Sequence, residues 1–174
     1  FERLGAEGVE VRLPEQVKGL DGLVIPGGES TTITLLLDSN DLREPLLEMA
    51  RRGRPIWGTC AGMIMLSRDV KDPRVRPLEL MGIHVNRNAF GRQIDSFEAD
   101  LSVPALGEKP FHGIFIRAPI VESVEEGVEV LARIPDGRIA AARQGRLLAT
   151  AFHPELTDDP RFHELFLEMT RQAG

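Results

Sequence analysis

Short apolar runs alternate with amphipathic segments over the first third of the chain. Apolar runs at 22–26 and 55–58 predict buried strands, and the first run ends at two glycines. Amphipathic patterns at 31–38, 43–52 and 61–67 predict helices. Strands that alternate with helices in this order indicate a parallel sheet with helices on both faces.

Strand patterns dominate the second half of the chain, and few helical segments separate them. The expected strands lie at 82–85, 113–118, 128–133, 138–143 and 146–152. Turn signals stand between the last three of them, at Asp136-Gly137 and at Gln144-Gly145. Short turns join antiparallel neighbours, so this half of the sheet should be partly antiparallel.

The last amphipathic pattern follows Pro160 and predicts a helix. Its apolar positions recur at i, i+3, i+4 and i+7, at Phe162, Leu165, Phe166 and Met169. We interpret this stripe as a face that packs on the core. No repeat or linker divides the chain, so residues 1–174 should form a single domain. The predicted fold class is α/β, with a mixed, mostly parallel central sheet flanked by helices.

Composition and charge exclude several classes of function. Hydrophobic residues make up 42% of the chain, as is typical of a globular protein. The net charge of −6 and the pI of about 5.3 argue against nucleic-acid binding, which normally needs a basic surface. No apolar stretch reaches the roughly 20 residues of a membrane helix, so no membrane contact is expected. A single cysteine forms no internal disulfide, which favours the cytoplasm and disfavours a structural zinc site.

The single cysteine stands in Gly58-Thr59-Cys60-Ala61-Gly62, between a predicted strand and a predicted helix. This is the pattern of a nucleophile elbow, a sharp strand-to-helix turn that exposes a reactive side chain. The glycines permit the turn, and the start of a helix favours a thiolate over a thiol. A buried structural cysteine is the alternative, because cysteine packs like a small hydrophobe.

His153 is the candidate general base, since it follows a predicted strand and imidazole titrates near neutral pH. Glu155 lies two residues further on and can hold the other ring nitrogen. A solvent-exposed loop histidine is the alternative. The other histidines are weaker candidates: His163 lies within the helical stripe and is interpreted as structural, whereas His84 and His112 lie in or beside strands.

The segment Pro26-Gly27-Gly28-Glu29-Ser30 follows the first predicted strand and offers backbone N–H groups to a developing oxyanion. The N–H of Ala61, directly after Cys60, is the natural second donor. An ordinary strand-to-helix turn with Ser30 or Thr31 as the helix N-cap is the alternative, and the two interpretations are compatible.

Two arginines lie beside predicted strands. Arg87 belongs to the polar stretch 86–93, and Arg117 belongs to Phe115-Ile116-Arg117-Ala118-Pro119. A guanidinium group can hold a substrate carboxylate through two parallel hydrogen bonds. A solvated surface charge is the alternative for each of them.

Together these motifs resemble the class I glutamine amidotransferases, and most closely the glutaminase-subunit family of the two-protein pyridoxal 5′-phosphate synthases. The resemblance spans residues 26–156. Five stretches carry it: Pro26-Gly27-Gly28-Glu29-Ser30-Thr31-Thr32, Gly58-Thr59-Cys60-Ala61-Gly62, Arg87-Asn88-Ala89-Phe90-Gly91-Arg92-Gln93, Phe115-Ile116-Arg117-Ala118-Pro119 and Phe152-His153-Pro154-Glu155-Leu156. The first, third and fourth stretches separate this family from other glutaminases.

The resemblance implies a role for each matching residue. The catalytic triad would be Cys60, His153 and Glu155. Glutamine would be bound by Gly28, Glu29, Ser30, Arg87, Ile116 and Arg117. The oxyanion hole would be formed by the N–H groups of Gly28 and Ala61. The implied fold is a flavodoxin-like three-layer domain. Its first strand would be absent from a chain that begins at Phe1, so residues 1–174 would be an N-terminally incomplete glutaminase domain.

The implied reaction is hydrolysis of L-glutamine to L-glutamate and ammonia, with no metal and no organic cofactor. The ammonia would pass to a synthase subunit within a hetero-oligomer, and pyridoxal 5′-phosphate would be the product of that complex. Two other functions stay open from the residues alone. A cysteine hydrolase or peptidase would show no preference for glutamine. A catalytically silent module that binds an amino acid would have no need of Cys60, His153 and Glu155 together.

Overall fold

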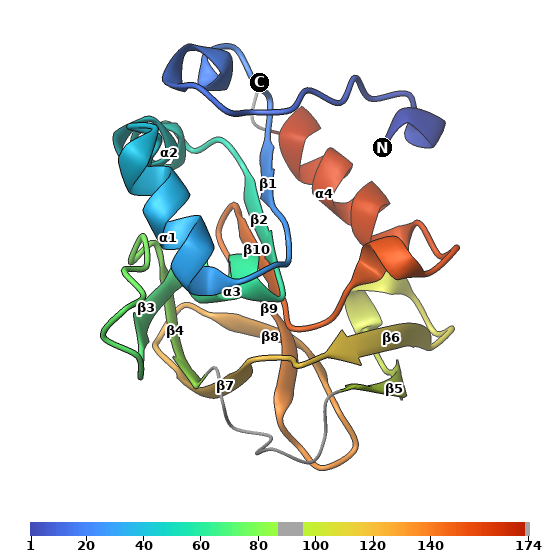
Figure 1. The fold of residues 1–174 in the computed structure, drawn as a ribbon. Helices are drawn as coiled ribbons and strands as arrows, with labels where there is room; N and C mark the ends of the chain where they lie inside the picture. Colours follow the sequence, from blue (N-terminus) through green and yellow to red (C-terminus); the bar gives the residue numbers. More distant parts are fainter. Residues whose placement is uncertain (87–95, 173–174) are drawn as a thin grey trace.

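The structure is a computed structural model that describes residues 1–86 and 96–172 (Figure 1). The α-helices are α1 (Ser30–Ser39), α2 (Arg43–Arg51), α3 (Ala61–Leu66) and α4 (Arg161–Arg171). The 3₁₀ turns are η1 (Glu2–Leu4), η2 (Pro14–Val17), η4 (Pro104–Leu106) and η5 (Pro154–Leu156). The strands are β1 (Leu23–Ile25), β2 (Ile56–Thr59), β3 (Ser67–Val70), β4 (Met81–Asn86), β5 (Ser96–Leu101), β6 (Phe111–Ile116), β7 (Ile120–Val124), β8 (Glu129–Arg133), β9 (Ile139–Gln144) and β10 (Leu147–Thr150).

One large sheet runs through the molecule in the order β1-β2-β10-β9-β7-β4-β3, with β8 paired to β9. β1 and β10 both pair in parallel with β2, and β3 is parallel to β4. The other described pairs of this sheet are antiparallel, and β5 and β6 form a separate antiparallel pair. Both predicted turn signals join antiparallel neighbours, β8 to β9 and β9 to β10. The predicted α/β class with a mixed sheet is confirmed.

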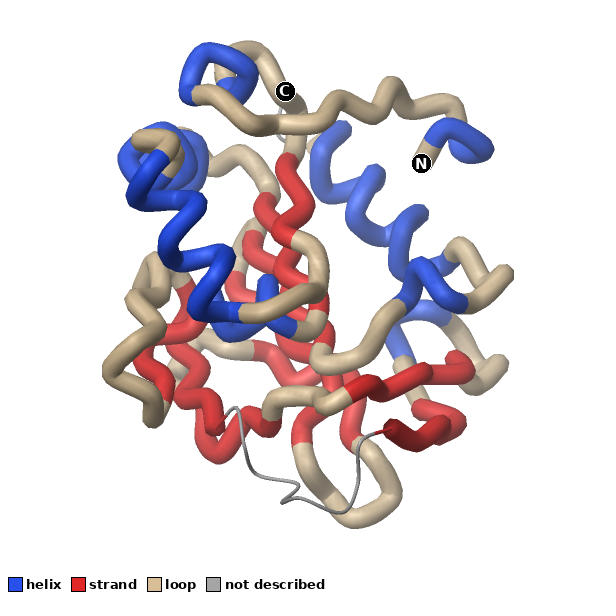
Figure 2. The backbone as a smooth tube through the Cα atoms, in the orientation of Figure 1, coloured by secondary structure: helices blue, strands red, loops and turns tan. Residues whose placement is uncertain are grey.

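Helices lie on both faces of the parallel strands. α1 and α2 lie on one side of β1, β2 and β10, and α4 lies on the other side (Figures 1 and 2). α3 follows β2 directly and packs against β1, β2 and β10. Within residues 1–86 and 96–172, no helix is long and apolar enough to cross a membrane.

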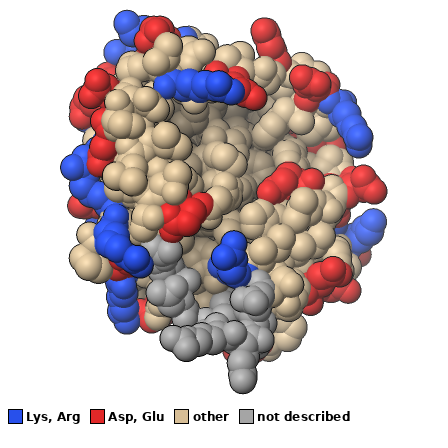
Figure 3. Space-filling view, viewed as in Figure 1, with Lys and Arg blue, Asp and Glu red and all other residues tan. Residues whose placement is uncertain are grey.

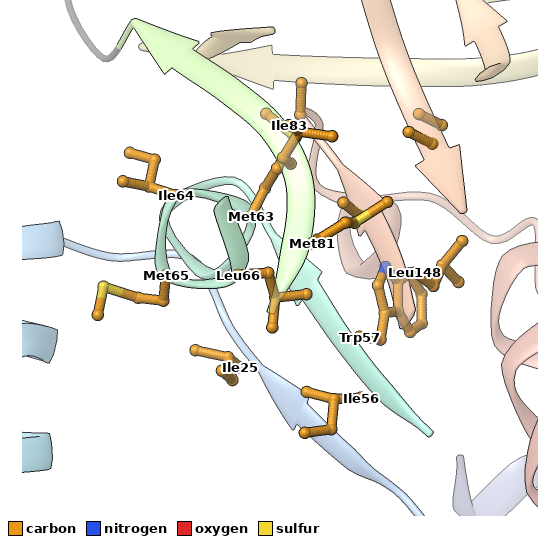
Figure 4. Close-up of a cluster of buried hydrophobic side chains, with 14 of the residues drawn as sticks. Ile25, Ile56, Trp57, Met63, Ile64, Met65, Leu66, Met81, Ile83 and Leu148 are labelled. Atoms are coloured by element: carbon orange, nitrogen blue, oxygen red, sulfur yellow. The ribbon is translucent and has the colours of Figure 1, made fainter. Parts of the chain in front are cut away.

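The hydrophobic core is built from both faces of the central strands (Figure 4). Trp57 on β2 is 1% exposed, and its ring centroid lies 5.6 Å from that of Phe166 on α4. α3 is buried along its whole length. Fully burying a large apolar side chain stabilises a fold by about 1.5–3 kcal/mol. α4 contributes Phe162, Phe166 and Met169 to this core, which confirms the interpretation of its apolar stripe.

The sequence patterns miss β3, β5 and β7. β3 contains the exposed Arg68 and Asp69, and among the described strands it pairs only with β4. β5 alternates exposed polar residues with half-buried ones, and its described partner is β6 alone. Strands of this kind lack a strong apolar pattern in the sequence. Their formation depends on pairing with neighbouring strands in the folded chain.

The turn from β2 to α3 leaves no room for a side chain at two positions. A Cβ atom on Gly62 would lie 1.8 Å from the carbonyl oxygen of Ile25. A Cβ atom on Gly58 would lie 2.3 Å from the carbonyl oxygen of Gly62. Both obstacles are backbone atoms, which cannot move aside without shifting β1 or α3. The glycines of the predicted elbow therefore allow the turn to pack against its neighbours.

We expect Gly62→Ala to destabilise the fold by about 3 kcal/mol or more, since its methyl group would overlap the backbone of β1. The thermal midpoint should fall by about 2–4 °C for each kcal/mol. Gly8→Ala is the matched control, because a Cβ atom on Gly8 meets nothing within 4 Å. Equal midpoints for the two variants would contradict this close packing.

Candidate active site

Cys60 occupies a strained position between β2 and α3. Its backbone φ of 51° lies in the left-handed region, which residues other than glycine rarely adopt. Its N–H donates to the carbonyl oxygen of Thr150 on β10 at 2.8 Å, and the residue is 7% exposed. Strain of this kind at a non-glycine residue is characteristic of functional sites. Cys60 therefore stands on the tight strand-to-helix turn that the sequence motif predicts.

Parallel pairing of β2 with β10 brings His153 to the side of the sheet where Cys60 lies. Thr59 and Thr150 are partners in the register, so the residues that follow the two strands leave the sheet at the same edge. Nδ1 of His153 is hydrogen-bonded to Oε1 of Glu155 at 2.7 Å. Nε2 is therefore the ring nitrogen that remains available to Cys60.

His153 is held in its protonated form. Two hydrogen bonds raise the pKa of His153 to about 10, the larger effect coming from Cys60 and the smaller from Glu155. Burial opposes the positive charge of the ring but is outweighed. Burial is the largest influence on Glu155 and acts to raise its pKa. The hydrogen bond with His153, a backbone hydrogen bond and the charges of His153 and His163 together outweigh burial, so the pKa of Glu155 lies below its ordinary value. Near neutral pH the site thus holds an imidazolium group between a sulfur atom and a carboxylate.

The other three histidines contact other side chains. The ring of His163 packs edge-on against Trp57, with centroids 5.2 Å apart, and burial lowers the pKa of His163. This packing confirms the structural interpretation of His163. His84 and His112 each lie between two exposed carboxylates. In the part of the chain that is described, no group of three or more His, Cys, Asp or Glu side chains is arranged to hold a metal ion.

Cys60 and His153 line a cavity of about 480 Å³, within the size range of small-molecule sites. Figure 3 shows that the face seen in Figure 1 is hollowed, with charged side chains gathered around the hollow. The cavity is lined by Gly28, Glu29, Ser30, Cys60, Ala61, Ile64, Ile116, Arg117, Pro119 and His153. Residues from four separate parts of the chain therefore meet in one place.

Nearly all the predicted site residues meet at this cavity. Glu155 contacts His153 without lining the cavity, and Arg87 lies outside the described residues. Sequence reasoning gave no role to Ile64 or Pro119. Ile64 lies one helical turn after Cys60 and so on the same face of α3, a spacing that could have identified it. Pro119 ends the motif in which the sequence predicts roles for Ile116 and Arg117.

Two of the lining residues supply the candidate backbone donors. Ala61 is the first residue of α3, and the first N–H groups of a helix have no acceptor within it. Gly28 has a φ of 144°, a conformation that favours glycine. The loop before α1 and the start of α3 thus place both predicted donors at the cavity.

Glu29 is the N-cap of α1. Its carboxylate accepts hydrogen bonds from the N–H of Thr32 at 2.8 Å and from the hydroxyl group of Thr31. The alternative with Ser30 or Thr31 as the N-cap is wrong. Glu29 directly precedes α1, and its side chain is long enough to accept from the N–H of Thr32 in the first turn. One carboxylate therefore both caps α1 and lines the cavity.

The end of β6 contributes Ile116 and Arg117 to the cavity. The carbonyl oxygen of Ile116 lies 3.8 Å from Sγ of Cys60, within hydrogen-bonding distance for a thiol. Arg117 has a φ of 43°, and its side chain is exposed. Two non-glycine residues of this one site, Cys60 and Arg117, thus have left-handed backbone conformations.

A mixed sheet between helices, with a cysteine and a histidine after two neighbouring parallel strands, defines a fold and site of the glutamine amidotransferase type. A solved structure described as a glutamine amidotransferase matches with a TM-score of 0.91 at 46% identity, over 98% of this chain and 89% of that one. The chain belongs to the SNO glutamine amidotransferase family, whose model matches residues 1–172.

Individual relatives agree with this assignment. The pyridoxal 5′-phosphate synthase subunit PdxT of Herpetosiphon aurantiacus is 61% identical over 170 residues, which cover 96% of this chain and 90% of the relative. PdxT of Moorella thermoacetica is 55% identical over 169 residues, which cover 97% of this chain and 89% of the relative. Family membership confirms the resemblance and decides against a cysteine peptidase.

We expect the ring protons of His153 to titrate with a midpoint near pH 10 in NMR spectra. Glu155→Gln replaces the carboxylate beside Nδ1 with a neutral amide, so the pKa of His153 should fall. Glu98→Gln is the matched control, because hydrogen bonds with Asp100 and, to a lesser extent, with Glu98 raise the pKa of His112. That variant should lower the pKa of His112 and leave that of His153 unchanged.

The raised pKa of His153 also predicts how the stability of the fold depends on pH. Because the pKa of His153 is raised from 6.5 to about 10 in the folded state, its protonation stabilises the fold fully below about pH 6.5. This contribution is lost as the pH rises toward 10. The free energy of unfolding of the wild type should therefore exceed that of Glu155→Gln by more near pH 6.5 than near pH 10, and the opposite trend between these two pH values would contradict the assignment.

Proposed function

We propose that the chain hydrolyses L-glutamine to L-glutamate and ammonia, with Cys60 as nucleophile, His153 as general acid and base, and Glu155 as the group that orients His153. One observation carries the proposal: the 2.7 Å hydrogen bond between Glu155 and His153 continues to Cys60 at the wall of a cavity of about 480 Å³. Membership of a glutamine amidotransferase family supports glutamine as the substrate.

The reaction begins when the Cys60 thiolate attacks the side-chain amide carbon of glutamine. The carbonyl oxygen becomes an oxyanion, for which the N–H groups of Gly28 and Ala61 are the proposed donors. His153, protonated near neutral pH, gives a proton to the amide nitrogen, so that the C–N bond breaks and ammonia leaves. A γ-glutamyl thioester remains on Cys60.

Water then releases glutamate from the thioester. Neutral His153 takes a proton from water while the water oxygen attacks the thioester carbon. The C–S bond breaks, glutamate leaves, and the thiolate and the imidazolium group are restored. Glu155 stabilises the imidazolium group and fixes which ring nitrogen faces the sulfur atom. The steps use groups of this chain, the substrate and water.

The cavity offers opposite charges for the two charged groups of a free amino acid. Glu29 can accept hydrogen bonds from the α-ammonium group, and Arg117 can donate to the α-carboxylate. Ser30 supplies a hydroxyl group, and Ile116 offers apolar contact to the side-chain methylene groups. Arg87 stays a predicted glutamine contact outside the described residues. Recognition of both charged groups would favour free glutamine over glutamine within a peptide.

We further propose that the ammonia serves a synthase subunit that makes pyridoxal 5′-phosphate. The relatives from Herpetosiphon aurantiacus and Moorella thermoacetica are named as subunits of that synthase, and this chain spans 90% and 89% of their lengths. Residues 1–174 would act as one glutaminase domain of a hetero-oligomer. A cytoplasmic location stays a prediction.

Cys60→Ala should lower kcat for glutamine hydrolysis by at least about 10⁴-fold, since the chain has no other thiol to form the thioester. The fold should stay intact, because the change removes one sulfur atom and adds no contact. Ammonia release from glutamine, assayed with the synthase subunit present, measures the effect.

His112→Gln is the control for Cys60→Ala, because His112 lies outside the cavity lining and should not be needed for activity. Near wild-type turnover by Cys60→Ala would contradict the mechanism. Failure of the wild type to hydrolyse glutamine would favour a catalytically silent binding module.

Ammonia release by the wild type should rise strongly when the synthase subunit is added, because a partner that binds the active geometry preferentially shifts the site toward it. Gel filtration of the mixture should show a complex. The synthase subunit with Cys60→Ala is the control and should release no ammonia. Full activity of the isolated chain, without a complex, would contradict this partner.

A further inference from the structure

Gly27 lies directly against the imidazole ring of His153. A Cβ atom on Gly27 would lie 2.6 Å from Cε1 and 3.3 Å from Nδ1 of His153. The same atom would lie 3.4 Å from Cβ of Cys60. Carbon atoms in contact prefer separations of about 3.5–4.0 Å, so the first distance leaves no room for a methyl group.

The overlap falls on the ring atom that joins the two ring nitrogens. Nδ1 is hydrogen-bonded to Glu155 at 2.7 Å, and Nε2 is the nitrogen left for Cys60. Cε1 is bonded to both nitrogens. A displacement of Cε1 therefore moves both nitrogens and disturbs both hydrogen bonds of His153 together.

The backbone of His153 cannot follow such a displacement. Its N–H donates to the carbonyl oxygen of Ile114 at 2.9 Å, and its carbonyl oxygen accepts from the N–H of Leu156 at 3.2 Å. Pro154, which follows, is buried. The ring can therefore relieve the overlap only by rotating about its side-chain bonds, away from its position between Glu155 and Cys60.

We propose that Gly27 is a positioning residue: the absence of a side chain at this position keeps the ring of His153 aligned between Glu155 and Cys60. The inference rests on the proposed function, because it concerns how His153 is held for that reaction. Gly28 has a φ of 144°, whereas Gly27 has no positive φ. The backbone conformation at position 27 is thus open to alanine, and the requirement for glycine arises from the ring.

A substitution at position 27 leaves every charge around the ring unchanged. Cys60 and Glu155 are the titratable partners of His153, and Glu29 and Arg117 line the same cavity. His163 acts on Glu155 from α4. Because Gly27→Ala alters none of these groups, a change in the titration of His153 reports a change in geometry.

Gly27→Ala tests the proposal. We expect kcat to fall by about 10²-fold, because a misplacement of about 1 Å is enough for a loss of this size. KM should stay within about threefold, since no substrate-binding side chain changes. In NMR spectra the titration midpoint of His153 should move below its wild-type value of about 10. Gly8→Ala, the same substitution in open space, should change none of the three quantities.

A double-mutant cycle tests the contact without relying on activity. Any fall in thermal midpoint caused by Gly27→Ala should disappear in a His153→Ala background, because the ring is then gone and Cβ of Cys60 at 3.4 Å is an ordinary contact. An equal fall in both backgrounds would overturn the proposal. So would a rise in KM alone, or wild-type values of kcat and of the titration midpoint.

The titration and the thermal cycle need no substrate. If the wild type fails to hydrolyse glutamine while Gly27→Ala still shifts the titration of His153, the proposed function fails and the positioning role stands. If the wild type is active and Gly27→Ala matches Gly8→Ala in every measurement, the positioning role fails and the proposed function stands.

Discussion

The hydrogen bond from the N–H of Cys60 to the carbonyl oxygen of Thr150, 2.8 Å long, joins the two parallel strands from which the site is built. One strand then turns into α3 through Gly62, and the other continues to His153. The nucleophile and the histidine meet because Thr59 and Thr150 are partners in the register of β2 and β10. A shift of one residue in this register would turn the side chains of one strand to the opposite face and separate the pair.

The partners that keep His153 protonated change during the proposed reaction, and this change favours proton transfer to the leaving group. The hydrogen bond with Cys60 is the largest cause of the raised pKa of His153, followed by the hydrogen bond with Glu155. When the sulfur atom of Cys60 bonds to the amide carbon of glutamine, it no longer accepts a hydrogen bond from His153, and this cause disappears before the C–N bond breaks. His153 should then become a stronger acid at the moment when the amide nitrogen needs a proton. Glu155 remains to hold the ring in place for the attack of water.

Sequence reasoning predicts the α/β class, the turn at Cys60 and most of the cavity lining, because each rests on a compact motif or a strong apolar pattern. It misses β3 and β5, whose mostly exposed or half-buried residues carry little local signal, and β7, whose buried Ile120 and Val121 form too short an apolar run to indicate a strand. It also misses what Gly27 and Ile64 contact. Gly27 touches a ring far along the chain. The spacing of Ile64 from Cys60 indicates a shared face, but the packing of α3 against β1 is what holds that face at the cavity. Contacts of this kind exist only once the sheet has formed.

The most direct measurement is to trap the reaction intermediate on Cys60. The protein and its synthase subunit would be mixed with isotopically labelled glutamine, quenched in acid within the first turnover and digested for mass spectrometry. We predict a γ-glutamyl thioester on the peptide that contains Cys60, and none when His153→Ala replaces the wild type. Rapid release of labelled glutamate with no label on that peptide, or release by Cys60→Ala, would contradict attack by this thiol.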